Sequence, residues 1–156
     1  MYGEGLRFVG RQTEERVALG RALRLAQSNP KAVAQISLAL AAFYEADHNY
    51  AKVEALYRRI TEVQRRMPGW FWLLRGANFA RWGKFSETEK YHRRATRMKS
   101  ADREEAYLNI GYVLRAQFKY KQAKKAFQKA LEIDPNYSEA KRAISSLQGV
   151  EAVTSK

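Results

Sequence analysis

The sequence predicts an all-α protein in which antiparallel helix pairs stack side by side as an α-solenoid. Helix-forming residues dominate the 156-residue chain, which has only three prolines and nine glycines. Similar residues also recur at a fixed spacing of 35 positions. A period of this length is typical of stacked repeats, because one helix pair cannot bury its apolar face alone.

The period is visible as columns of aromatic and small residues. The aligned sets are Tyr50, Phe85 and Tyr120; Tyr57, His92 and Phe127; and Ala41, Gly76 and Gly111. Small residues let two helices cross closely, and aromatic side chains fill the space beside the crossing. Each period is therefore predicted to be one helix, a short turn and a second helix.

Helix-breaking residues divide the chain in order. The N-terminal stretch, residues 1–13, is expected to be a short arm. Pro30, Pro68 and Pro135 are expected between repeats, where a helix must stop. Within a repeat, Gly83 is expected in the turn, and the spacing from Ser86 to Glu89 predicts a capping box that opens the next helix. Residues 149–156 lack periodicity and are expected to be a disordered tail.

The segment from Ala106 to Pro135 has the most complete pattern. Its spaced aromatic, small and helix-ending residues are Tyr107, Gly111, Ala123, Phe127, Ala130 and Pro135. This pattern resembles a tetratricopeptide repeat, and the resemblance implies a right-handed superhelix. The resemblance implies one domain, residues 14–148. This domain is expected to consist of a half repeat (14–33), three repeats (34–68, 69–103, 104–137) and a capping helix (137–148). Arg75, at an apolar position of the pattern, has no assigned role.

Composition argues against catalysis and cofactors. The chain has no cysteine, which excludes disulfides, thiolate metal sites and a cysteine nucleophile. Its two histidines, His48 and His92, lie in different repeats without metal-ligand spacing, and His92 is expected in the core. No phosphate-binding or nucleophile motif and no membrane-spanning apolar run occurs. We therefore expect a non-enzymatic, cytoplasmic protein without a cofactor or metal.

In the family that the sequence resembles, the first helices of successive repeats line a concave groove. The corresponding positions predict a partner-binding groove made of Leu38, Trp70, Leu73, Ala77, Arg81, Leu108, Asn109, Tyr112 and Arg115, with Gln35, Ala42, Glu45 and Glu105 at the same phases. An apolar middle with Arg81 and Arg115 at one rim suits a peptide with apolar anchors and an acidic flank. Alternatively, some of these side chains pack against the terminal helix.

One known binding mode of the family is not expected here. Members that clamp the acidic tail of heat-shock chaperones use lysine and asparagine at groove positions. The corresponding residues of this chain are Leu38, Ala42 and Leu74, and only Asn109 agrees with that pattern. The sequence therefore predicts a different peptide partner.

The net charge leaves a second function open. The chain carries +13, and residues 69–156 hold 18 bases and 9 acids, with no acid from Ala106 to Leu131. Such a surface is either simply solvated or attracts anionic partners. Together with the tryptophans Trp70, Trp72 and Trp82 it suggests RNA binding as the alternative function. Self-association through an exposed end of the repeat array is a third possibility.

Overall fold

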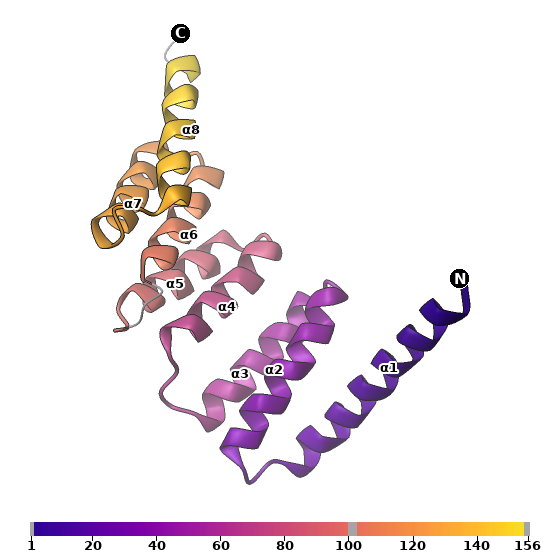
Figure 1. Ribbon diagram of the computed structural model, residues 1–156. Helices are drawn as coiled ribbons and strands as arrows, with labels where there is room; N and C mark the ends of the chain where they lie inside the picture. The colour runs from indigo at the N-terminus through magenta and orange to yellow at the C-terminus, as the bar shows by residue number, and fades with distance from the viewer. Residues whose placement is uncertain (1, 100–102, 155–156) are drawn as a thin grey trace. The chain divides into compact units, whose positions relative to one another are not determined.

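The structure, a computed structural model, describes residues 2–99 and 103–154, which form eight α-helices and no β-strand (Figure 1). The helices are α1 (Tyr2–Leu25), α2 (Pro30–Ala46), α3 (Tyr50–Val63), α4 (Gly69–Arg81), α5 (Phe85–Thr96), α6 (Arg103–Ala116), α7 (Tyr120–Ile133) and α8 (Ser138–Thr154). They form two compact units, Met1–Arg66 and Met67–Lys156. The predicted all-α class with sequential helix pairs is confirmed.

The repeat period appears directly in the backbone. Helices α3, α5 and α7 begin at the aligned residues Tyr50, Phe85 and Tyr120. The turn before each of these helices contains one residue with a left-handed backbone. These residues are His48 (φ 53°), Gly83 (φ 75°) and Phe118 (φ 60°), again 35 positions apart. The three pairs α2–α3, α4–α5 and α6–α7 are therefore three copies of one helix–turn–helix unit.

In the first compact unit, α2 packs against both α1 and α3 (Figure 1). Asparagine side chains fix two helix starts: the Oδ1 atoms of Asn29 and Asn49 accept hydrogen bonds from the backbone N–H groups of Ala32 (3.1 Å) and Lys52 (3.2 Å). Such caps satisfy donors that a helix start otherwise leaves unpaired.

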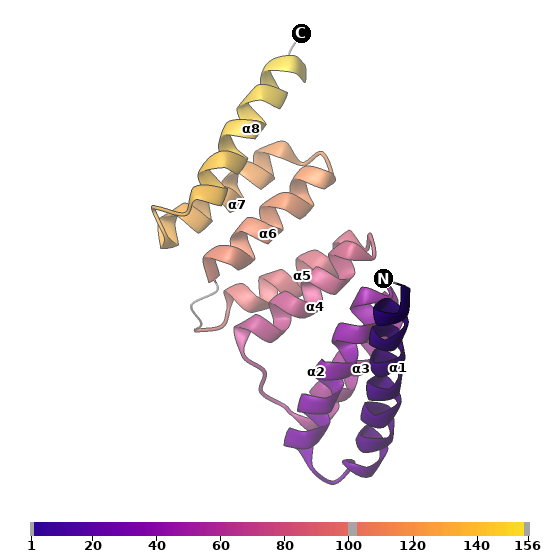
Figure 2. The same ribbon diagram turned by 45° about the vertical axis from the view of Figure 1, so that its right-hand side comes forward.

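In the second compact unit, each helix packs against the next along the chain, and α4 also contacts α6 (Figure 2). One part of its core lies between α6, α7 and α8, with Leu108, Ile110, Leu114, Ala123, Ala126, Phe127, Ala130, Ala140, Ala143 and Leu147 buried together. The aligned glycines lie at helix crossings, as predicted. The ring of His92 lies over Gly76, and the ring of Phe127 lies over Gly111.

Both ends of the chain differ from expectation. Helix α1 begins at Tyr2, so the expected arm over residues 1–13 is helical from its second residue onward. Helix α8 continues to Thr154, past the expected start of the tail at residue 149. Residues 14–25 and 138–148 are rich in helix formers, and each helix propagates outward from that segment. Residues 1, 155 and 156 lie outside the described part of the chain.

The expected capping box at Ser86 is wrong. Helix α5 begins one residue earlier, at Phe85, and its N-cap residue Lys84 makes no side-chain capping bond. Thr88, inside the first turn, donates from Oγ1 to the carbonyl oxygen of Lys84 (2.8 Å). The periodic aromatic residue sets the helix start here, because Phe85 occupies the same place as Tyr50 and Tyr120.

Replacing Phe118 with glycine is expected to stabilise the second compact unit by about 0.5 to 1 kcal/mol. A left-handed backbone costs a residue with a Cβ atom about 1–2 kcal/mol, and glycine already holds this position at Gly83. Phe118 is 78% exposed, so its removal sacrifices little buried area. Urea unfolding followed by tryptophan fluorescence measures the effect. An unchanged or lower midpoint in Phe118→Gly contradicts it, and Gly83→Ala is expected to lower the midpoint.

Candidate binding surface

Exposed side chains form a row along each of the first helices α4 and α6. On α4 the row is Trp70, Leu74, Ala77 and Arg81, at the i, i+4, i+7 and i+11 spacing of one helix face. On α6 the equivalent positions of the next repeat include Asn109 and Tyr112. We call these six residues the α4–α6 face. Trp70, Leu74 and Tyr112 are 42%, 40% and 37% exposed, which is high for large apolar side chains at neighbouring positions.

Two of the predicted groove residues are not accessible. Leu73 and Leu108, which are equivalent in the two repeats, are only 7% and 5% exposed. Leu108 packs into the core with Ala140, Ala143 and Leu147 of α8. Successive residues of an α-helix are rotated by about 100°, so the residue after a buried one can point away from the core. The accessible positions are accordingly the next ones along the chain, Leu74 and Asn109. The predicted residue Leu38 is half-buried on α2, in the other compact unit.

The terminal helix α8 also contacts the predicted groove residue Arg115. This contact agrees with the alternative that some groove residues pack against the terminal helix. Nη1 of Arg115 donates to Oγ of Ser146 on α8 (3.1 Å), and its guanidinium carbon lies 5.3 Å from the centre of the Tyr112 ring. Before α8, Tyr137 lies close to the first turn of α6. Its pKa is raised by burial and then by the negative charge of Glu105. Helix α8 thus borders the α4–α6 face and leaves Tyr112 exposed.

The exposed aromatic rings of this face are anchored on buried ones. Trp70 meets the fully buried Phe71 edge to face, with ring centres 6.2 Å apart, and Tyr112 meets the fully buried Phe127 in the same way at 5.3 Å. Such pairs restrict ring motion. The face is therefore held in place before any partner binds, which reduces the entropy cost of binding.

The three tryptophans do not form a shared stacking platform. Trp72 is 3% exposed and stacks on Tyr91, with ring centres 6.0 Å apart and an interplanar angle of 1°. The guanidinium carbon of Arg94 covers the Trp72 ring, 3.7 Å from its centre. Trp82 stacks on Phe79 and lies under the Lys84 ammonium at 3.5 Å. The expectation that Trp72 is available to a nucleic-acid base is wrong, because its ring is part of the core.

The structure gives Arg75 a place in the core of the second unit. Its side chain is 8% exposed, and its guanidinium carbon lies 4.5 Å from the centre of the Tyr91 ring. A cation over an aromatic face is stabilised by the electron-rich ring, the more so when water is excluded. Arg75 therefore extends the Tyr91–Trp72 stack from inside the unit.

One histidine of the chain is buried and the other is exposed. His92 is buried as expected, and burial lowers its pKa from 6.5 to about 4, so it is neutral at pH 7. His48 is exposed in a turn, with Nδ1 3.0 Å from the hydroxyl oxygen of Tyr50. Across residues 2–99 and 103–154, no three His, Cys, Asp or Glu side chains are placed to share a metal ion. Nor does this part of the chain contain a helix long and apolar enough to cross a membrane.

Comparison with known families identifies the fold. Residues 104–137, which span α6, α7 and the turn between them, match the tetratricopeptide repeat family. The chain therefore contains a tetratricopeptide repeat. Among curated proteins none matches the chain.

Solved structures with the tetratricopeptide repeat fold align with most of the chain. The structure of MamA aligns at a TM-score of 0.74 and 15% identity, covering 96% of this chain and 84% of that one. YrrB, described as having an unusual peptide-binding site, aligns at 0.69 and 16% identity, covering 96% and 74%. The second tetratricopeptide repeat domain of human RPAP3, in complex with the HSP70 peptide SGPTIEEVD, aligns at 0.66 and 18% identity, covering 77% and 98%. At these identities the likeness shows the fold.

Proposed function

We propose that this protein is a non-catalytic, cytoplasmic interaction module that binds a peptide segment of a partner protein on the α4–α6 face. The observation behind the proposal is the exposure of Trp70, Leu74 and Tyr112 on α4 and α6, the first helices of two successive repeats. Large apolar side chains fixed at the surface are the residues that dominate binding energy in protein interfaces.

The positive charges at one end of the face indicate that the peptide also carries acidic residues. Arg81 lies in the last turn of α4 and Arg115 in the last turn of α6, so both bases lie at the C-terminal ends of the two helices. A guanidinium binds a carboxylate through two parallel hydrogen bonds, which fixes the direction of the peptide. We therefore expect apolar anchors over Trp70, Leu74 and Tyr112, followed by acidic residues near the arginines.

The peptides bound by proteins of the same fold support this class of ligand. RPAP3 binds a peptide that ends in acidic residues, and the structure of YrrB also has a peptide-binding site. In this chain an exposed leucine, Leu74, lies in the middle of the face. An apolar surface favours a peptide with hydrophobic anchors over one held mainly by its terminal carboxylate.

The double variant Leu74→Asp with Tyr112→Asp is expected to weaken peptide binding by about 100-fold, because each change buries a charge against apolar anchors. Peptides are first selected from a random library on the immobilised protein, and their dissociation constants are measured by fluorescence polarisation. The matched control is Ile133→Asp, since Ile133 is 39% exposed and lies outside the face. We expect unchanged binding in the control and unchanged helical circular dichroism in both proteins.

Two results count against the proposal. One is selected peptides that bind the double variant and the wild-type protein equally. The other is a selection that enriches no sequence with apolar anchors and an acidic flank.

A further inference from the structure

A second surface of the Met67–Lys156 unit is built from bases. A hollow of about 210 Å³ between α5 and α7 has α6 as its floor and is lined by Arg93, Tyr107, Ile110, Leu114, Gln122, Lys125, Ala126 and Lys129. A second hollow of about 480 Å³, along α5, is lined by Lys90, Arg93, Arg94, Arg97 and Met98. The two hollows share Arg93 and therefore adjoin. We define the basic trough as Lys90, Arg93, Arg94, Arg97, Lys125 and Lys129.

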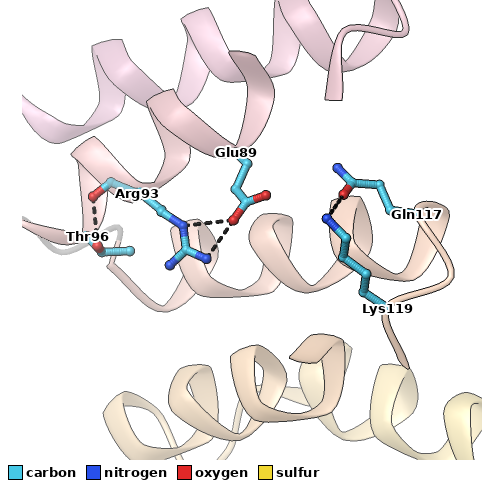
Figure 3. Close-up of polar contacts among 5 residues, drawn as sticks. All are labelled: Glu89, Arg93, Thr96, Gln117 and Lys119. Carbon is cyan, nitrogen blue, oxygen red and sulfur yellow. Dashed lines mark hydrogen bonds and ion pairs between the residues drawn. The ribbon is translucent and has the colours of Figure 1, made fainter. Parts of the chain in front are cut away.

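Most of the charge in the basic trough is not compensated locally. Glu89 accepts hydrogen bonds from Nε (2.9 Å) and Nη2 (2.6 Å) of Arg93 (Figure 3), and this pair lies on the α5 side of the trough. Within residues 2–99 and 103–154, no acidic side chain lines either hollow. Helix α7 also lies in the acid-free stretch from Ala106 to Leu131, except for its last two residues. The trough is thus a site of concentrated positive charge.

We propose that the basic trough binds the phosphate backbone of single-stranded nucleic acid, independently of the peptide-binding α4–α6 face. Along each helix the bases follow at three- or four-residue spacing, as in Lys90, Arg93 and Arg97, which places neighbouring Cβ atoms about 5–6 Å apart on one face of the helix. Flexible basic side chains in such a row can each contact one phosphate of a strand. Polyphosphate binding needs such a row and no shape-specific anchor.

The lining of the basic trough favours nucleic acid over a peptide or a membrane. Among the described residues, none of the exposed large apolar side chains lines either hollow, so the trough lacks the protruding apolar contacts that the α4–α6 face offers to a peptide. A membrane surface is entered by protruding apolar side chains, whereas the apolar residues here form a recessed floor. Tyr107 on that floor is partly exposed, with the Lys129 ammonium 5.8 Å from its ring centre, and offers a face on which a base can stack.

The test measures binding of a fluorescein-labelled oligouridylate of about 20 nucleotides to the full chain by fluorescence anisotropy across a salt series. If the trough neutralises four phosphates, the affinity for the oligouridylate is expected to fall about 50-fold between ~50 and ~200 mM salt. The variant with Lys90, Arg97, Lys125 and Lys129 all changed to glutamate is expected to lose about 100-fold or more at low salt. Arg94 is left intact because it covers Trp72.

A matched control distinguishes the trough from the overall charge of the protein. It changes Lys31, Arg58, Arg65 and Arg66, which are exposed in the other compact unit, to glutamate and so alters the net charge by the same amount. The proposal predicts a loss of less than about 5-fold in the control, because these four residues belong to the other compact unit and line neither hollow. Equal losses in both variants overturn it, as does an affinity that is independent of salt.

Two competitors distinguish nucleic acid from other anions. Phosphatidylserine vesicles and polyglutamate, at equal total negative charge, are each expected to compete much more weakly than unlabelled oligouridylate. If either competes equally well, the trough is a general anion site or a membrane site, and the proposal is wrong. The Leu74→Asp and Tyr112→Asp protein is expected to bind oligouridylate normally, so failure of the peptide proposal and failure of this one are distinguishable.

Discussion

Replacing Gly111 with alanine is expected to lower the free energy of unfolding of the second compact unit by about 2 kcal/mol. A Cβ atom at this position would overlap the ring of Phe127, which is fully buried, so the ring or the helix must shift to admit it. Overpacking of this kind costs about 1–3 kcal/mol. The gain of about 1 kcal/mol in helix propensity from glycine to alanine offsets only part of a severe overlap. Urea unfolding followed by fluorescence is suited to this measurement, because Trp70, Trp72 and Trp82 all lie in the second unit.

Two companion variants show whether the Phe127 ring is the cause. Adding Phe127→Leu to Gly111→Ala is expected to cost less than the sum of the two single changes, since the smaller side chain makes room for the new methyl group. Gly20→Ala, in α1, has no atom within 4 Å of the added Cβ and is expected to leave the fluorescence midpoint unchanged. A midpoint for Gly111→Ala at or above that of the wild-type protein contradicts the account of the helix crossing.

Acid is expected to destabilise the second unit through His92. Burial lowers the pKa of His92 to about 4 in the folded protein, against 6.5 for the unfolded chain. Between these two values the unfolded chain binds a proton that the folded protein does not, so the free energy of unfolding falls as the pH falls. The loss from this group amounts to about 3 kcal/mol by pH 4 and is absent above pH 7.

The variant His92→Phe is expected to remove this pH-dependent loss. Phe127, at the equivalent position of the next repeat, packs on Gly111 as His92 packs on Gly76, so the site accepts a phenyl ring. The change also removes a buried Nδ1 atom that has no hydrogen-bond partner among the described residues, and we expect a gain of about 1 kcal/mol at pH 7.

The measurement compares urea unfolding of the wild-type protein and His92→Phe from pH 7.5 to pH 4, so that contributions of the carboxyl groups cancel in the difference. His48→Asn is the control, because His48 is the other histidine of the chain and is exposed. It is expected to keep the wild-type pH dependence. If His92→Phe keeps it as well, His92 is not the acid-sensitive group.

The period, the turns and the helix crossings were predictable because local residues determine them. Aligned aromatic residues begin the second helices, and Gly83 adopts the positive φ expected of a glycine turn. His48 and Phe118 adopt the same conformation without glycine. There the 35-residue period, rather than the residue type, indicates the turn, because the repeat geometry overrides the local preference for glycine.

The exposed face of the first helices was predictable only to the nearest residue. The sequence placed Trp70, Ala77, Arg81, Asn109 and Tyr112 on these helices, where the structure leaves them at least partly accessible. Leu73 and Leu108 lie one position before the exposed residues, and Leu108 is covered by residues of α8. Which of two adjacent apolar residues is buried depends on the rotation of a helix against its neighbours, and the 35-residue period does not contain that information.

The basic trough was also only partly predictable from the sequence. The excess of lysine and arginine after residue 69 is evident in the sequence, and Lys125 lies in its acid-free stretch. The hollow between α5 and α7 is not evident, because Arg93 and Lys129 line the same hollow only after the helices pack. Likewise, only the packed structure shows that Trp72 is buried under Arg94.

The central claim, that peptides bind the α4–α6 face, is tested most directly by a nuclear magnetic resonance titration of the ¹⁵N-labelled protein with a selected peptide. The indole N–H signal of the exposed Trp70 and the side-chain amide of Asn109 are expected to shift most, while the buried Trp72 indole shifts little. Shifts confined to α5 and α7, or to the first compact unit, with Trp70 and Asn109 unchanged, would contradict the claim.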